Sequence, residues 1–283
     1  MESIKELQAS ETSLFLFGSG TGTNYSNLRE QDAPLSKGGT SSGPLPFIKG
    51  LDANAGAIKS GGKTRRAARM VILNVDHPNI EEFIDTKVLA ERMAKDLIKL
   101  GWPSDYNGIV YSSLPYQNGN NSIRVTDAFM NATVNDEEYL LNTFDKKPKH
   151  LSAQKVFNKI VDAAHYCADP GLQFDTVINE WHTCPSSGKI NGSNPCSEYM
   201  FLDDSACNLA SHNLKKYDKE GVFDTHSFEY ATRLGITAME IAVDISLYPT
   251  KKITENSKKF RPLGIGWTNG GALLMSRGIP YDS

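Results

Sequence analysis

Apolar and polar residues follow each other along the chain at spacings that predict both strands and helices. The run 70–75 (MVILNV) is apolar and rich in β-branched side chains, which predicts a short buried strand. An amphipathic helix is predicted from about residue 80 to Gly101, because apolar side chains recur there every three or four positions and a glycine closes the pattern. At its start Ile80, Phe83 and Ile84 are expected on one face, and the apolar positions that repeat after them are Leu89, Met93, Leu97 and Leu100.

The alternation of strand and helix continues toward the end of the sequence. Helices are predicted over 152–167 and 226–247, and the first ends before Pro170. Residues 263–267 (LGIGW) predict one more strand before another helix, whereas 102–125, with NGNN and several serines, predict a loop region with short strands. The sequence therefore predicts an α/β fold, and the pattern by itself does not decide between a barrel and an open sheet.

Composition narrows the class of protein. Of the 283 residues, 39% are hydrophobic and 22% are charged, enough for a buried core in one large domain or two small ones. A net charge of −3 argues against a general nucleic-acid or membrane-surface binder, and no run of about 18 apolar residues predicts a membrane helix. Four cysteines without a CxxC pair, and no signal-peptide pattern, predict a reducing, cytoplasmic setting.

Glycine is concentrated between residues 18 and 64, which hold ten of the 23 glycines and predict tight turns or close backbone approach to a ligand. The GGKT motif at 61–64 resembles the end of a P-loop, but Ala57 stands where that motif requires its first glycine, so this interpretation is rejected. The basic residues of this segment are Lys59, Lys63, Arg65, Arg66 and Arg69. They are compatible with a solvated charged turn, with an anion site or, least favoured because no aromatic residues are interleaved, with an RNA-binding arm.

The cysteines differ in their surroundings. Cys167 lies on the apolar face of a predicted helix, where a structural thiol is expected. A zinc site made of His182, Cys184, Cys196 and Cys207 would have intervals far wider than the usual pairs of metal ligands, so we expect no metal here.

Cys196 lies between Asn194 and Glu198, each two residues away. In an extended or finger-like loop these three side chains would point to the same side and converge on one molecule. The amide can hold a hydroxyl group of a polyhydroxylated substrate and the carboxylate can accept its proton. A carboxylate would raise the pKa of a nearby thiol, which favours radical chemistry over a thiolate nucleophile, although a histidine base elsewhere in the fold would permit the latter.

Several segments together resemble the catalytic (large) subunit of ribonucleotide reductases. They occur in the usual order of that family and span nearly the whole chain: GSGTGTNYSNLR, GGTSSGPLPF, SGGKTRRAARMVILNVDHPNIEEFI, GLQFDTVINEWHTCP, NPCSE, ACNLASHNL and RPLGIGWTN. NPCSE and SGGKTRRAA are most similar to the adenosylcobalamin (vitamin B12)-dependent class, and the oxygen-dependent class is the alternative. The resemblance implies part of a ten-stranded α/β barrel, with effector loops within 36–69 and a central finger loop at about 190–200 that carries Cys196.

The resemblance also implies roles for individual residues. Cys196 matches the cysteine that becomes a thiyl radical and takes the 3'-hydrogen of the ribose, Glu198 the base for the 3'-hydroxyl, and Asn194 a residue that hydrogen-bonds the substrate. Cys207 matches one of two cysteines that form a redox-active disulfide. Substrate contacts are implied for Ser26, Asn194, Pro195, Cys196, Ser197 and Glu198, and effector contacts for Lys63, Arg65 and Arg66.

The implied activity is the reduction of ribonucleotides to 2'-deoxyribonucleotides for DNA synthesis, with diphosphate or triphosphate substrates both open. The implied partners are a deoxynucleotide effector, a second copy in a homodimer, a thioredoxin-type reductant and the remaining segments of the reductase, with no nucleic acid and no membrane. We expect the N-terminal part, the second redox cysteine and the C-terminal half of the barrel to lie outside these residues, so that the chain alone is inactive. The alternatives are an inactive nucleotide-binding fragment and a non-radical enzyme with Cys196 as its nucleophile.

Overall fold

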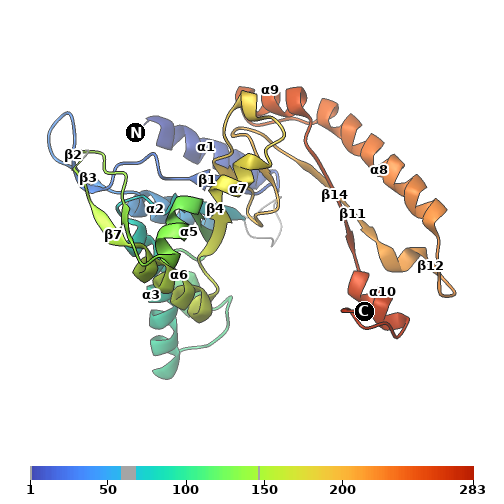
Figure 1. The fold of residues 1–283 in the computed structure, drawn as a ribbon, viewed down its shortest axis with the longest axis horizontal. Coiled ribbons are helices and arrows are strands. Elements are labelled where there is room, and N and C mark those ends of the chain that lie inside the picture. Colours follow the sequence, from blue (N-terminus) through green and yellow to red (C-terminus); the bar gives the residue numbers. More distant parts are fainter. Residues whose placement is uncertain (1, 59–67, 146) are drawn as a thin grey trace. The chain divides into compact units, whose positions relative to one another are not determined.

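The computed structural model describes residues 2–58, 68–145 and 147–283 (Figure 1). The chain divides into two compact units, residues 1–203 and 204–283. Lys63, Arg65 and Arg66, for which effector contacts are predicted, lie outside the described residues.

A four-stranded parallel sheet forms the centre of the first unit, in the order β1-β4-β5-β8. Its strands are β1 (Thr21–Asn24), β4 (Arg69–Asn74), β5 (Gly119–Val125) and β8 (Gly171–Phe174). β4 confirms the strand predicted over 70–75. Helix-containing connections join successive strands, as parallel pairing requires, and so the four carboxyl ends meet at one edge of the sheet. The predicted α/β class is confirmed.

β5 is a strand within 102–125, where a loop region with short strands is predicted. Its sequence, GNNSIRV, contains polar residues that are typical of loops, yet nearly all of the strand is buried. The polar groups are accommodated by hydrogen bonds: Asn121 Nδ2 donates to Thr86 Oγ1 (3.1 Å), and Asn121 N donates to Asp169 Oδ1 (3.1 Å). Buried polar groups are stable when they are hydrogen-bonded, so this strand lacks the apolar pattern of β4.

Helices α3, α5 and α6 gather on one side of the sheet (Figure 1) and share a hydrophobic core with it and with α2. The bounds are α2 (Leu45–Ala57), α3 (Ile80–Lys99), α5 (Asp127–Val134) and α6 (Ala153–Cys167). Phe83, Phe129 and Ile160 from three of these helices are at most 2% exposed. The sheet contributes Val71, Leu73, Ile123 and Val125 to the same core.

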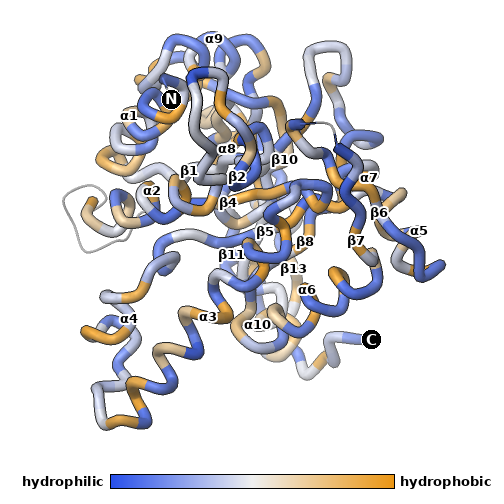
Figure 2. The backbone as a smooth tube through the Cα atoms, turned by 90° about the vertical axis from the view of Figure 1, so that its left-hand side faces the viewer, coloured by the Kyte–Doolittle hydropathy of each residue, from blue (hydrophilic) through white to orange (hydrophobic). Residues whose placement is uncertain are grey.

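The helix predicted from residue 80 is confirmed as α3, but its apolar repeat does not enter the core. Leu89, Met93 and Leu100 are exposed, whereas Phe83, Ile84 and other residues of a different face are buried. Orange and blue stretches alternate along α3 in Figure 2, as expected for a helix in which apolar residues recur at helical spacing. The expected face of Ile80, Phe83 and Ile84 is buried, whereas the repeat that follows it is not.

The helix predicted over 152–167 is confirmed as α6. Ser152 Oγ caps its first turn by accepting from Lys155 N, and Ala168 ends it with a left-handed backbone, φ 64°. Cys167 is half-buried, and its Sγ donates to Ala163 O (3.3 Å). Burial raises the pKa of this thiol, which agrees with a structural role.

Besides the 3₁₀ helix η2 (Pro185–Ser187), the first unit contains further helices and strands. They are α1 (Glu2–Leu16), β2 (Gln31–Pro34), β3 (Thr40–Ser42), α4 (Ile109–Ser113), β6 (Glu138–Leu140), β7 (His150–Ser152), α7 (Asp175–Glu180), β9 (Gly192–Ser193) and β10 (Met200–Phe201). β2 pairs with β3, β6 with β7, and β9 with β10, each in antiparallel fashion.

In the second unit, the parallel pair β11 (Asn208–Asn213) and β14 (Leu263–Thr268) is connected through α8 (Thr225–Ile245) and α9 (Lys251–Phe260). The remaining elements are the 3₁₀ helix η3 (Leu214–Tyr217), β12 (Asp218–Lys219), β13 (Val222–Phe223) and α10 (Gly270–Ser276). The predicted helix 226–247 and strand 263–267 are confirmed, including the helix after the strand. Among the described residues of the whole chain, no helix has both the length and the apolar character to cross a membrane.

Candidate active site

Cys196 lies in the loop of the antiparallel hairpin formed by β9 and β10, in which Ser193 pairs with Met200. The loop is a tight turn, so of the extended and finger-like loops predicted from the spacing of Asn194, Cys196 and Glu198, the extended one is wrong. Ser197 N donates to Asn194 O (3.2 Å), and Ser197 adopts a left-handed backbone with φ 70°. The extended conformation is excluded because Asn194 closes the loop with its own side chain: Asn194 Oδ1 accepts from Tyr199 N (3.0 Å).

The predicted site residues of the turn differ in how exposed they are to solvent. Cys196 and Glu198 are exposed, Asn194 and Ser197 are half-buried, and Pro195 is buried. Because Asn194 Oδ1 accepts a backbone proton, the orientation of this amide is fixed, and its Nδ2 group is the part that can donate to a ligand. The site therefore presents a thiol, a carboxylate and an amide donor.

The hairpin packs on the face of the sheet opposite the helices. Gly22 in β1 and Gly20 just before this strand permit the contact. A Cβ atom on Gly22 would overlap the carbonyl oxygen of Ser193, and one on Gly20 would lie 2.5 Å from Pro195 Cγ. On the next strand, Ile72 Cδ1 lies 3.2 Å from the position of a Cβ on Gly192. The close backbone approach predicted for the glycine-rich segment is thus made, at these two positions, to the hairpin that carries Cys196.

Side chains of β5 and β8 hold the hairpin on the same face. Asn120 Nδ2 donates to Pro195 O (2.8 Å). Gln173 Nε2 donates to Ser193 Oγ (2.8 Å) and to Ser197 Oγ (2.9 Å). The residues directly before and after Cys196 are therefore both anchored to the sheet.

Arg124 organises the polar groups beneath the hairpin. Its guanidinium donates to Asp175 Oδ1 from Nε (2.8 Å) and Nη2 (2.6 Å), and from Nη2 also to Ile190 O (2.9 Å). Its Nη1 donates to Gln173 Oε1 (3.1 Å). Burial opposes ionisation of Asp175, but hydrogen bonds from Lys189 and Arg124 outweigh it and hold the pKa of that carboxyl below its usual range.

Ser26 lies at the carboxyl end of β1, beside the end of β4 and the base of the hairpin. Ser26 Oγ accepts from Asn74 N (2.7 Å), and Ser26 N donates to Asn24 Oδ1 (2.9 Å). Asn24 Nδ2 donates in turn to Asn74 Oδ1 (2.9 Å) and Asn191 O (2.8 Å). The structure thus brings Ser26 and the base of the hairpin to the carboxyl edge, where α/β sheets bind ligands. The turn itself lies toward the amino ends of the strands, because Pro195 meets Gly20 before β1 and Asn120 near the start of β5.

Several polar residues of this site were not identified from the sequence. Asn120, Arg124, Gln173 and Asp175 all support the hairpin, yet none of them was assigned a role. The signal for Arg124 was present, because an arginine between Ile123 and Val125 in a strand must be paired when it is buried. Gln173 and Asn120 have no comparable local signal, since their partners lie 24 and 75 residues away.

Asp76 is a further carboxyl group close to this site. It follows β4 by two residues and interacts electrostatically with Lys189 and Asp175, and burial raises its pKa. Nothing in the sequence distinguished it from other acids.

Cys207, which matches a redox cysteine, belongs to the second unit. It directly precedes β11 and is half-buried, and its Sγ donates to Asn208 O (3.3 Å). A Cβ atom on Gly264 of β14 would lie 3.4 Å from this sulfur. Cys207 is a thiol, as are the other three cysteines, all of which lie within the described residues.

His182 and Cys184 interact locally. His182 is buried, and its Nδ1 accepts from Cys184 N (3.4 Å), while its ring packs edge-on against Phe201. In the part of the chain that the structure describes, no three His, Cys, Asp or Glu side chains gather in a way that could hold a metal ion.

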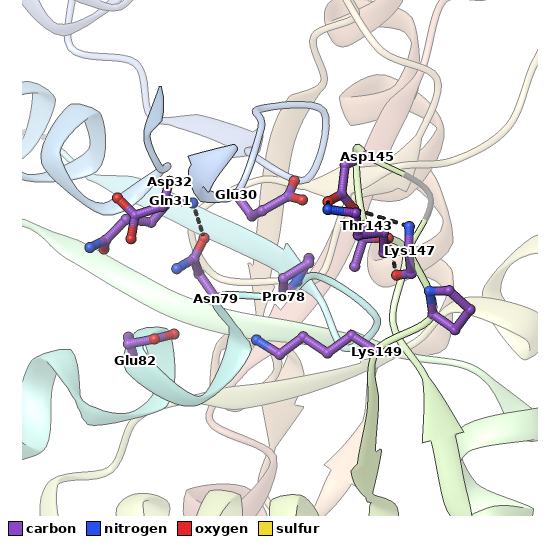
Figure 3. A pocket seen from close by; sticks show the side chains of 11 residues that line it. Glu30, Gln31, Asp32, Pro78, Asn79, Glu82, Thr143, Asp145, Lys147 and Lys149 are labelled. Carbon is purple, nitrogen blue, oxygen red and sulfur yellow. Dashed lines mark hydrogen bonds and ion pairs between the residues drawn. The ribbon is translucent and has the colours of Figure 1, made fainter. Parts of the chain in front are cut away.

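A cavity of about 330 Å³ lies elsewhere in the first unit, at β2 and the start of α3 (Figure 3). Acidic Glu30, Asp32 and Glu82 and basic Lys147 and Lys149 are among its lining residues. None of the predicted substrate-binding or catalytic residues lines it. The cavity is therefore separate from the hairpin site.

Comparison with known proteins covers the whole chain. The sequence model of the family described as "Ribonucleotide reductase, barrel domain" matches residues 1–283. The chain belongs to the ribonucleotide reductase barrel-domain family. The resemblance inferred from the motifs is thereby confirmed.

Several relatives of this chain are named as vitamin B12-dependent reductases. The vitamin B12-dependent ribonucleotide reductases of Rhodopirellula baltica and Streptomyces coelicolor are 51% and 50% identical to it over all of its residues. A vitamin B12-dependent ribonucleoside-diphosphate reductase of Mycobacterium tuberculosis is 35% identical over 94% of the chain. The chain spans 28%, 30% and 36% of the lengths of these three relatives.

Proposed function

We propose that this chain is the section of a ribonucleotide reductase catalytic subunit that presents the reacting thiol to the substrate, in the reduction of ribonucleotides to 2'-deoxyribonucleotides. The observation that carries the proposal is the exposed thiol of Cys196, on a turn anchored on both sides, in a chain of the reductase barrel-domain family. A thiol held in this way is pre-organised for a substrate that binds over the polar face of the sheet.

Three residues of the turn would act on the ribose. Cys196, as a sulfur radical, takes the 3'-hydrogen atom, so that the C–H bond breaks and an S–H bond forms. The exposed carboxylate of Glu198 accepts the proton of the 3'-hydroxyl. Asn194 Nδ2 donates a hydrogen bond to a substrate oxygen, while Oδ1 holds Tyr199 N and keeps the amide in this orientation. Ser26, Pro195 and Ser197 complete the proposed contacts.

The reducing electrons would come from Cys207 and a second cysteine. Each thiol gives up one hydrogen, together two electrons and two protons, and the pair ends as a disulfide while the 2'-oxygen leaves as water. A thioredoxin-type reductant would restore the thiols by disulfide exchange. The half-buried sulfur of Cys207 at the start of β11 supports this role, because a half-buried thiol is still accessible for exchange.

Adenosylcobalamin is the cofactor we propose, because the relatives are named vitamin B12-dependent, and those names also favour this class over the oxygen-dependent one. The residue of this chain that fits such a group is Cys196, since an exposed thiol on a projecting turn can be approached by a bulky cofactor. When bound, adenosylcobalamin supplies radical chemistry. The part of this chain is to exchange a hydrogen atom at Cys196 Sγ and to keep that sulfur in place. We propose no metal site of the chain itself.

The proposal extends to the fold and to the partners. The four parallel strands would be part of a ten-stranded barrel, with the hairpin as its central finger loop, and the seating of the hairpin on the polar face of the sheet supports this. A deoxynucleotide effector would bind loops within 36–69. A second copy would pack on α3, where exposed Leu89, Met93 and Leu100 form an apolar surface of the kind found at interfaces.

The test uses cysteine variants of the reductase polypeptide that carries these residues at its natural length. Cys196→Ser abolishes deoxynucleotide formation in the presence of adenosylcobalamin and dithiothreitol, because a hydroxyl cannot replace the thiol as a hydrogen-atom carrier. Cys207→Ser permits at most about one turnover per site, because the disulfide cannot form. Cys184→Ser is the matched control and retains activity. Steady turnover by both of the first two variants would overturn the proposal.

A further inference from the structure

The polar face of the first unit's sheet contains a line of linked side chains that runs from Asp175 through Arg124 and Gln173 to Ser197. We propose that Gln173 is a positioning residue for Cys196: it fixes the turn in the conformation that exposes the thiol. The structural argument depends on the described contacts alone. Its consequence for turnover depends on the proposed function.

Gln173 uses its whole amide group. The residue is 1% exposed, and both protons of Nε2 are donated to the hairpin, one to Ser193 Oγ and one to Ser197 Oγ. Ser193 Oγ donates onward to Asn194 O (2.9 Å), so the amide holds both ends of the turn. A buried side chain with one partner would give less directional control than this pair of bonds.

The orientation of that amide is also determined. Gln173 Oε1 accepts from Arg124 Nη1, so a rotated amide would place its NH₂ group against the guanidinium. Arg124 cannot turn away, because Asp175 and Ile190 O bind its other nitrogens. Lys189 Nζ, 2.7 Å from Asp175 Oδ2, holds the carboxylate in turn. Each group in the line thus fixes the next one.

The anchors lie on either side of Cys196 and leave its side chain unanchored. Asn120 holds Pro195 O, Gln173 holds Ser197 Oγ, and the thiol between them is exposed. Ser197 has φ 70°, a backbone conformation that is unfavourable for a residue other than glycine. The hydrogen bond from Gln173 stabilises this residue at that conformation, and a turn released from it would relax.

Gln173→Leu removes the amide at nearly unchanged volume, and Asn121→Leu is the matched control. Asn121 is also a buried amide, 4% exposed, on the neighbouring strand, but it faces α3 through Thr86. Both variants lose buried hydrogen bonds and both lose stability, but only Gln173→Leu releases the turn. We expect amide hydrogen exchange at Ser197 and Tyr199 to rise about tenfold in Gln173→Leu and to stay unchanged in Asn121→Leu.

Ser197→Ala removes the same hydrogen bond from its other end, and it leaves Arg124 and Asp175 intact. It raises exchange at Tyr199 in the same direction, and the double variant Gln173→Leu/Ser197→Ala exceeds Gln173→Leu only slightly, since the shared bond is already lost. Equal exchange at residues 194–199 in Gln173→Leu and Asn121→Leu, or fully additive effects in the double variant, would overturn the proposal.

Turnover gives the second readout, in the reductase polypeptide of natural length. In Gln173→Leu we expect kcat to fall about tenfold or more while KM stays within about twofold, because the thiol is misplaced and substrate binding is retained. A rise in KM with kcat unchanged would contradict a positioning role. If Cys196→Ser retained activity, the proposed function would fail while the exchange result still stood. If exchange were unaffected while Cys196→Ser was inactive, only the positioning role would fail.

Discussion

The two faces of the four-stranded sheet are both buried. One packs against helices through apolar contacts, and the other binds the hairpin of Cys196 through hydrogen bonds. On the helix side, Val71, Leu73, Ile123 and Val125 pack against α3, α5 and α6. On the other side, Asn120, Arg124 and Gln173 hold the hairpin of Cys196 by hydrogen bonds. The same strands therefore provide an apolar surface for the core and a polar surface for the site.

The difference teaches how the fold separates stability from positioning. Burial of apolar area is favourable in many relative orientations, so the helix side can stabilise the unit without defining any one atom's place. Hydrogen bonds need particular distances and angles, so the polar side can define where the turn lies. We therefore expect substitutions on the helix side to change mainly stability, and substitutions on the polar side to change stability and the hairpin together.

The largest effect is expected on the helix side. Phe129 is fully buried and packs edge-on against Tyr139, and Phe129→Ala should lower the free energy of unfolding by about 4 kcal/mol through lost burial and the cavity left behind. Urea denaturation measures the loss, with exposed Phe17→Ala as the control. Below the unfolding transition, hydrogen exchange in the hairpin should match that of the unsubstituted protein. Faster exchange there at equal stability would remove the distinction between the two faces.

A slightly smaller effect is expected on the polar side, with a different signature. Arg124→Met removes the guanidinium from Asp175, which keeps Lys189 and a longer bond from Asn179, and leaves Gln173 Oε1 without its donor, which should cost about 3 kcal/mol. In contrast to Phe129→Ala, this variant should also accelerate exchange at Ser197 and Tyr199. Arg233→Met on α8, which alters an exposed arginine, serves as the control. A loss of stability with an unchanged hairpin would show that Arg124 does not act through Gln173.

The smallest effect is a dependence of stability on pH through Asp175. Lys189 and Arg124 hold its pKa below the usual range despite burial, so the unfolded chain takes up a proton at this carboxyl before the folded chain does. The stability it contributes is therefore present above the ordinary aspartate pKa of about 4 and is lost as the pH falls toward the lower, folded value. Asp175→Asn should flatten this part of the curve of unfolding free energy against pH. An unchanged slope between about pH 5 and pH 3 would contradict the assignment.

The apolar side of this comparison could largely be predicted from the sequence. β4 and α6 follow from their apolar patterns, because packing against a core selects for those patterns. α3 was predicted as a helix, but Leu89 and Met93 are exposed, since periodicity identifies an apolar face without telling what will cover it. Of the candidate site, the motifs singled out Cys196, and the family comparison confirms the resemblance on which that prediction was based.

The polar side could not be predicted, because it depends on contacts between distant parts of the chain. The polar residues of β5 predicted a loop region with short strands, and the strand is accommodated by the bonds of Asn121 to Asp169 and of Arg124 to Asp175. The spacing of Asn194, Cys196 and Glu198 left an extended and a finger-like loop open, and the hydrogen bond from Tyr199 N to Asn194 Oδ1 excludes the extended one. Neither the hydrogen bonds between distant residues nor the bond within the turn produces a periodic pattern in the sequence.

The contact between β1 and the hairpin has a consequence for the order of folding. Gly22 adjoins Ser193, and the bond from Asn24 to Asn191 joins residues 167 positions apart. Closing so long a loop costs more conformational entropy than any neighbouring contact, so this contact should form after the strands between them have paired. A chain growing from its N-terminus would complete the sheet before it could seat the turn. The thiol of Cys196 would then reach its final position only after the sheet of the first unit has formed.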